Sequence, residues 1–208
     1  MNKIVISIGI FFVITTVSAE TTTFDSEKIA AIPSGWSAGV TGSGMAKWNV
    51  EADVTAPSAP HVLKQSGIGD FLWCVKNDVL LVDGMVEVKF KSISGKSDQA
   101  GGVVWRWKDK DNYYVARGNA LENNVSLYYT EKGKRHTIKY VNAPVARDVW
   151  HVLRVEFVGE MIKVSLDGKT YIELNDNHIN GAGKAGVWTK ADSVTAFDDF
   201  AYAASVKK

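Results

Sequence analysis

Residues 152–174 read VLRVEFVGEMIKVSLDGKTYIEL, and they give a clear indication of the fold. Apolar and polar side chains alternate along it with a period of two, which is the pattern of strands with one buried face. Gly159-Glu160 and Asp167-Gly168 separate three such runs. Asp-Gly between alternating runs is a strong hairpin signal, because glycine tolerates the positive φ that the turn needs. The stretch therefore predicts three antiparallel strands joined by two tight turns.

The same pattern recurs along the rest of the chain. Residues 84–91 alternate strictly, and Lys132-Gly133 separates the runs 125–130 and 135–141. No long stretch has the i, i+3, i+4, i+7 repeat of a helix, and no linker, internal repeat or low-complexity tract divides the chain. About a dozen strands, each with one apolar and one polar face, predict an all-β sandwich of two antiparallel sheets. A closed barrel is the alternative.

The first nineteen residues are predicted to be a secretory signal peptide. Lys3 precedes an apolar run over residues 4–14, and Val17-Ser18-Ala19 matches a cleavage site of small residues. The apolar run is shorter than the roughly 20 residues that span a bilayer. Residues 20–208 are then a single domain, which we expect in a bacterial periplasm or outside the cell, with no membrane insertion after cleavage.

The net charge and the cysteine content indicate which classes of partner the protein can bind and whether a disulfide stabilises it. The chain has 24 Lys and Arg against 23 Asp and Glu, and loss of Lys3 with the signal leaves 23 against 23. A net charge of zero argues against nucleic acid as a partner. Cys74 is the only cysteine and lies in the apolar run FLWCV, residues 71–75. It is predicted to be a buried thiol, so no internal disulfide holds the domain.

Two segments carry a resemblance to a known superfamily. Residues 150–157 (WHVLRVEF) and 162–168 (IKVSLDG) resemble the strand–turn–strand of laminin-G-like and other concanavalin A-like domains. Residues 183–193 (GKAGVWTKADS), closing in the FDDF of residues 197–200, are similar to the ending of bacterial exported proteins of that superfamily. These include the 3-keto-disaccharide hydrolase domain family. The resemblance covers residues 83–202 and implies a jelly roll whose concave sheet carries a ligand groove.

Aromatic and hydrogen-bonding side chains gather between residues 98 and 129. Alternation places Tyr113, Arg117 and Asn119 on one face, and a face with such polar groups is costly to bury without partners. Rings beside planar donors suit a sugar, and arginine can bind the carboxylate or sulfate of an acidic sugar through two parallel hydrogen bonds. The predicted ligand-binding residues are Arg106, Tyr113, Arg117, Asn119, Trp188 and Lys190.

Motifs for glycoside hydrolysis are incomplete. A retaining glycosidase needs two carboxylates about 5–5.5 Å apart. Glu51-Ala52-Asp53 begins like the Glu-x-Asp-x-x-Glu pattern of the glycoside hydrolase family 16 members of the superfamily, but Ala56 stands at its last position. The remaining catalytic candidates are Glu122 and Asp199, and the sequence identifies a partner for neither.

The sequence requires no cofactor. The four histidines are isolated and no HExxH or Cys/His cluster is present, which argues against zinc chemistry. The resemblance implies a structural calcium ion held by Asp198 or Asp199, and such hard cations take carboxylate and carbonyl oxygens. The alternative is that this pair caps a strand or binds a nearby arginine.

Three functions remain open from the sequence. The first is an exported carbohydrate-binding domain that recognises a sugar in the concave-sheet groove. The second is a carbohydrate-active enzyme, a glycoside or 3-keto-disaccharide hydrolase or a lyase, and the third is a protein-interaction module. Short turns favour the first, whereas the polar cluster favours the second. A structural role for Arg106 and Arg117, paired with Glu122 or Asp98, is the alternative to ligand binding.

Overall fold

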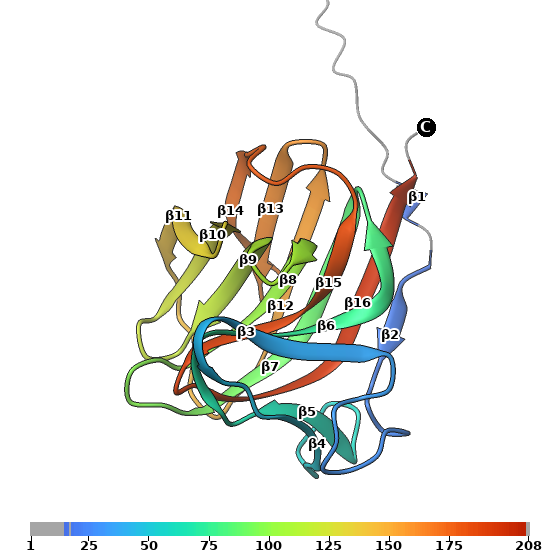
Figure 1. The fold of residues 1–208 in the computed structure, drawn as a ribbon, viewed down its shortest axis with the longest axis vertical. Helices are drawn as coiled ribbons and strands as arrows, with labels where there is room; N and C mark the ends of the chain where they lie inside the picture. Colours follow the sequence, from blue (N-terminus) through green and yellow to red (C-terminus); the bar gives the residue numbers. More distant parts are fainter. Residues whose placement is uncertain (1–14, 17, 207–208) are drawn as a thin grey trace, which may run out of the picture.

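The computed structural model describes Thr15–Thr16 and residues 18–206, so the signal peptide predicted for residues 1–19 lies largely outside the described residues. Their strands form two antiparallel sheets, which confirms the predicted all-β sandwich over the closed barrel (Figure 1). Among the described residues there is no helix that would be long and apolar enough to cross a membrane.

One sheet has nine strands. Its hydrogen-bonded order is β14-β13-β12-β7-β16-β5-β4, and β1 and β2 also pair with β16. The strands are β1 (Thr15–Thr16), β2 (Glu20–Thr22), β4 (Trp48–Ala52), β5 (His61–Gln65), β7 (Gly84–Ser94), β12 (Trp150–Val158), β13 (Met161–Leu166), β14 (Lys169–Asn175) and β16 (Val194–Val206).

The second sheet has seven strands in the order β11-β10-β9-β8-β15-β6-β3. They are β3 (Trp36–Met45), β6 (Ile68–Leu81), β8 (Ala100–Asp109), β9 (Asn112–Asn119), β10 (Asn124–Glu131), β11 (Lys134–Asn142) and β15 (Gly183–Ala191).

The predicted meander is the run β12-β13-β14. Leu153 pairs with Leu166, and Val164 pairs with Ile172, so the apolar side chains of the three strands share the inner face. Asp167 and Gly168, which join β13 to β14, have φ values of 50° and 78°. Positive φ at both central residues is the property of a two-residue hairpin turn whose twist matches that of the strands.

The main core lies between the two sheets. Phe90 of β7 is fully buried against β8 and β9. A Cβ at Gly101 or Gly118 would lie 2.3 Å or 2.7 Å from the Phe90 ring, so the close approach of the sheets here requires glycine. Cys74 is buried in this core as predicted, and burial raises the pKa of its thiol.

Strand β3 brings the far edge of the seven-stranded sheet back toward the β8–β9 turn. Figure 1 shows β3 running across the direction of β8 and β9. The Thr41 hydroxyl on β3 lies 2.8 Å from the Tyr113 hydroxyl and also donates a hydrogen bond to the Lys110 carbonyl. The strong twist of the sheet therefore closes part of its outer face.

Candidate functional site

The outer face of the seven-stranded sheet holds a second apolar cluster. Tyr113 and Trp188 lie on this face, as the alternation predicted, but neither has any exposed surface. Phe71 stacks on Trp188 with ring centroids 5.9 Å apart, and burial raises the pKa of Tyr113. These two rings therefore pack the protein itself and do not face solvent. The buried members of the cluster are Trp73, Val75, Ala100, Val104, Tyr113, Val115, Tyr128 and Trp188.

A buried polar network adjoins this cluster. Asp98, which is fully buried, accepts hydrogen bonds from Arg117 Nη1 at 3.0 Å and from Asn119 Nδ2 at 2.7 Å. Its second oxygen accepts from Lys190 Nζ at 3.0 Å. The structure thus brings together three of the predicted binding residues, Arg117, Asn119 and Lys190, around one carboxylate.

The N–H groups of Arg117 donate hydrogen bonds to other side chains of the protein. Besides Asp98, Nη2 donates to Glu122 Oε2 at 2.8 Å, and Nε and Nη2 lie 3.4 Å and 3.2 Å from the Tyr128 hydroxyl. Burial alone would lower the pKa of Arg117, but the charge of Asp98 and the Tyr128 and Glu122 groups raise it. Arg117 is 2% exposed. It is therefore placed to position Glu122 rather than to contact a ligand.

Glu122 is a member of the network that reaches the protein surface. Its side chain is 40% exposed, and Oε2 also accepts from Asn124 Nδ2 at 2.7 Å. Asn124 Nδ2 lies 3.0 Å from the hydroxyl of Tyr140, a residue that is 48% exposed. Burial alone would raise the pKa of Glu122, but the hydrogen bonds from Asn124 and Arg117 lower it. Glu122 is therefore ionised at neutral pH.

An open pocket of about 510 Å³ adjoins Glu122. Its walls are Glu122, Asn123, Asn142, Ala143 and Pro144. Carboxylate and amide groups of this kind can bind the hydroxyl groups of a sugar. Asn142 was missed in the sequence because β11 carries polar residues in both alternating positions, so its pattern does not single out one face.

Arg106 does not belong to this network, and its predicted grouping with Arg117 and Asn119 is wrong. It is 2% exposed and donates to the carbonyls of Ile179 at 3.1 Å and Gly159 at 2.7 Å. Its φ is 46°, and the pairing of β8 with β9 shifts register between Trp105 and Asp109. This irregularity breaks the alternation and turns the Arg106 side chain toward the end of the sandwich. Its role is therefore structural, but its carboxylate partner is Asp83 at 3.4 Å and not Glu122 or Asp98.

Asp198 and Asp199 lie on β16 and fix the loop between β4 and β5. Asp198 accepts from the backbone N–H groups of Ser58 and Asp199, both at 2.7 Å. Asp199 accepts from the Ser58 hydroxyl at 2.6 Å and pairs with Lys89 Nζ at 2.6 Å. Each of the four carboxylate oxygens thus has a donor from the protein. The described residues contain no group of three or more His, Cys, Asp or Glu side chains able to hold a metal ion.

Asp198 has a perturbed carboxyl group. Burial, with smaller effects from the charges of Asp199 and Asp25, raises the pKa of Asp198 to about 6. Hydrogen bonds from backbone N–H groups oppose this rise.

The two catalytic candidates stand on different sheets. Glu122 lies in the loop between β9 and β10 of the seven-stranded sheet, whereas Asp199 lies on β16 of the nine-stranded sheet. They therefore do not form the carboxylate pair of a glycosidase. The carboxylate that does share a partner with Glu122 is Asp98, which is fully buried and holds three donors.

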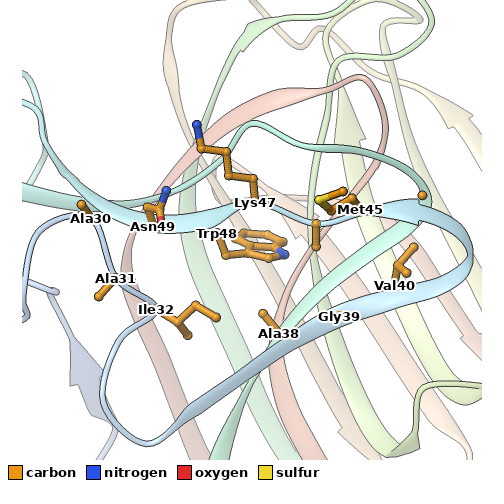
Figure 2. Close-up of a pocket in the computed structure, with 12 residues that line it drawn as sticks. Ala30, Ala31, Ile32, Ala38, Gly39, Val40, Met45, Lys47, Trp48 and Asn49 are labelled. Carbon is orange, nitrogen blue, oxygen red and sulfur yellow. The ribbon is translucent and has the colours of Figure 1, made fainter.

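A larger pocket of about 560 Å³ lies elsewhere, between β3, β4 and residues 30–32. Figure 2 shows the Trp48 ring at its centre with Ile32 and Val40 on either side, and Lys47 extending away from the ring. The pocket has no acidic residue or histidine among its lining residues. Its polar side chains are Lys47 and Asn49, and Trp48 is only 2% exposed. Because it lacks a carboxylate, the smaller pocket beside Glu122 is the better candidate site.

Comparison with known proteins identifies the fold through solved structures only. No protein-family model matches the chain, and no curated protein matches its sequence, so the predicted closeness to 3-keto-disaccharide hydrolase domains stays a prediction. Solved structures do match. The carbohydrate-binding module CBM66 from Bacillus subtilis is 19% identical with a TM-score of 0.65, over 88% of this chain and 99% of that one.

Two glucan hydrolases have the same architecture. The β-glucanase of Bacillus licheniformis is 14% identical with a TM-score of 0.58, covering 93% of this chain and 100% of the other. The laminarinase of Rhodothermus marinus is 12% identical with a TM-score of 0.59, covering 93% and 98%. The chain has the concanavalin A-like jelly-roll fold, which is shared by binding modules and hydrolases alike.

Proposed function

We propose that this protein binds a carbohydrate, without transforming it, at the Glu122 end of the seven-stranded sheet. The observation that carries the proposal is the pairing of a pre-positioned, ionised Glu122 with an open pocket lined by two asparagines. Tyr140 is half exposed beside it. The fold that the chain shares with CBM66 and two glucanases is consistent with a sugar ligand.

The buried network explains why such a site would be selective. Asp98 fixes Arg117, and Arg117 fixes Glu122. A carboxylate held in one rotamer loses little conformational entropy when it accepts hydrogen bonds from two sugar hydroxyls. Asn123 and Asn142 supply both donors and acceptors, and the exposed Tyr140 ring supplies an apolar surface for the face of a pyranose.

Binding is favoured over hydrolysis by the state of the carboxylates. A general acid needs a raised pKa, whereas the pKa of Glu122 is lowered. A retaining mechanism also needs a second accessible carboxylate. Asp98 has no exposed surface, and Asp199 is on the other sheet.

A glycan array on the protein lacking residues 1–19, followed by a reducing-sugar assay on each hit, tests the proposal. We expect binding without release of reducing ends. Glu122→Gln should weaken binding about tenfold, because it removes a charge-assisted hydrogen bond to the sugar and loosens the contact with Arg117. Glu173→Gln on exposed β14 is the matched control and should bind as the parent does.

Turnover of a hit that is abolished by Glu122→Gln would assign the protein to the enzymes instead. A hit whose affinity is the same in the Glu122 and Glu173 variants would place the sugar elsewhere on the molecule.

Two further proposals concern the setting of this site. Export with cleavage after Ala19 is supported by the sequence pattern of residues 1–19. Its test is the N-terminal sequence of the secreted protein, which should begin at Glu20. A structural calcium ion at Asp198 and Asp199 is supported by the two adjacent carboxylates on β16, of which that of Asp198 is buried.

A further inference from the structure

Arg135 lies over the aromatic cluster of the seven-stranded sheet. It projects from edge strand β11, and its guanidinium carbon is 4.2 Å from the centroid of the Tyr128 ring. The centroids of Phe71 and Trp188 are 4.8 Å and 5.9 Å away. The three rings come from strands β10, β6 and β15, so Arg135 covers the middle of the outer face.

Within the described part of the chain, Arg135 is the one arginine whose guanidinium donates to no protein acceptor. Arg106, Arg117, Arg147 and Arg154 each donate to a carboxylate or a carbonyl. Arg135 Nη1 is buried and has no hydrogen-bond partner. Burial lowers the pKa of Arg135, and the positive charge of Arg117 lowers it further.

The strand that carries Arg135 is basic. Lys132, Lys134 and Lys139 flank it, and none of the three forms an ion pair with a described acidic residue. Lysines on an edge strand commonly prevent it from pairing with other chains. That role explains exposed lysines, but it does not explain a guanidinium held inward on three rings with an unsatisfied N–H group.

We infer that the sugar bound by this protein is anionic, and that Arg135 binds its carboxylate or sulfate group. This inference rests on the proposed carbohydrate-binding function. Nη1 is buried, whereas Nε and Nη2 also lack a protein acceptor among the described residues but are not among the buried atoms. These two N–H groups form a parallel pair of donors that suits a planar carboxylate or a sulfate, and the rings beneath fix the plane of the guanidinium. The lysines of β11 add long-range attraction for an anionic chain.

The arrangement also orients the ligand. Asn142, in the pocket beside Glu122, lies on the same strand as Arg135 and seven residues further along. At about 3.3 Å per residue the two are separated by roughly 20 Å, which is the length of several sugar units. Ionised Glu122 repels an anion, so the anionic group lies at the Arg135 end and neutral hydroxyls lie at the Glu122 end.

Affinity electrophoresis in native gels tests this inference with matched probes. Dextran and dextran sulfate share one backbone and differ in charge, and polygalacturonate presents carboxylates instead of sulfates. At physiological salt, we expect retardation by a charged polymer and much less by dextran. Arg135→Met keeps an apolar stem over the rings while removing the charge, and should weaken that retardation about tenfold or more. Which of the two charged polymers responds tells sulfate from carboxylate.

Lys139→Met is the matched control, because it removes one charge from the same strand without a guanidinium seated on rings. It should change the retardation by less than about twofold. An equal loss of retardation in the two variants would show nonspecific electrostatic attraction to the basic edge strand. That result would overturn the role of Arg135 in ligand binding. Retardation by dextran equal to that by both charged polymers would overturn the anionic ligand.

The failure of this inference is distinguishable from that of the proposed function. Neutral glycans that bind through Glu122, with no preference for charged polymers, would remove only the anionic ligand. Absence of binding to every neutral and charged glycan would remove both. Circular dichroism and urea unfolding of Arg135→Met establish that its fold is intact before binding is compared.

Discussion

The outer faces of the two sheets contain the same kind of arginine–carboxylate cluster, which is exposed on one sheet and buried on the other. On the nine-stranded sheet, Arg154 bridges Glu87 at 3.3 Å and Glu156 at 2.9 Å, with a side chain that is 32% exposed. On the seven-stranded sheet, Arg117 bridges Asp98 and Glu122 with a side chain that is 3% exposed. One face is an ordinary solvated surface, whereas the other is a buried scaffold.

The difference in burial decides what each face can do. Exposed ion pairs contribute little to stability, because water and salt screen them and two long side chains must be ordered. A buried charge is costly unless its partners are in place, so the Asp98 network holds its members in one arrangement. Only a face of the second kind can present a pre-positioned carboxylate to a ligand.

Removal of Asp98 should have the largest effect on stability. Asp98→Ala leaves Arg117, Asn119 and Lys190 without their common acceptor, and Arg117 with a buried charge opposite Glu122 alone. We expect a loss of about 3–5 kcal/mol in the free energy of unfolding, measured by urea denaturation. A loss below about 1 kcal/mol would show that the network is not a scaffold.

Titration of Asp198 should give an intermediate effect on the nine-stranded sheet. The pKa is raised from 3.8 to about 6 in the folded protein, so folding favours the protonated carboxyl. Without calcium, stability should fall by on the order of 1–2 kcal/mol as pH rises from about 4 through 6. Asp198→Asn should remove this contribution.

Addition of calcium gives a second test of the Asp198 carboxyl. If the ion binds at Asp198 and Asp199, millimolar calcium chloride should raise stability above pH 6 and shift the carboxyl titration, followed by NMR, to lower pH. Magnesium chloride at equal ionic strength is the control. A titration of Asp198 that stays near pH 6 in calcium would contradict the calcium proposal.

Removal of an exposed ion pair should have the smallest effect. Glu156→Gln breaks the contacts with Arg154 and Lys163. We expect a change of about 0.2–1 kcal/mol in the free energy of unfolding, and less in high salt. A loss of unfolding free energy as large as that for Asp98→Ala would show that the two faces do not differ in how strongly their ion pairs stabilise the protein.

Much of the fold could be predicted because its signals are local. Alternation and the Asp167-Gly168 turn define β12 to β14, and both turn residues have the positive φ that this requires. Alternation also placed Tyr113 and Arg117 on one face correctly. It could not show that this face is buried, because the closure by β3 depends on the twist accumulated over the whole sheet.

The site was predicted only in part. Arg106 departed from the prediction because a register shift in β8 interrupts the alternation. Arg135 and Asn142 gave no signal, since β11 is an edge strand with polar residues on both faces. The pairing of Arg117 with Asp98 and Glu122 was the alternative to the predicted ligand binding, and the burial of these residues follows from packing between distant strands rather than from any short motif.

Mapping of a bound glycan by NMR would locate the binding surface, which we expect at the Glu122 end of the seven-stranded sheet. Amide resonances of the 15N-labelled protein are followed as the strongest array hit is added. The largest shifts should fall in the loop after Asn119 and along β11, from Asn142 toward Arg135. Shifts concentrated on β12–β14 or around Trp48 would contradict binding at the Glu122 end of the sheet.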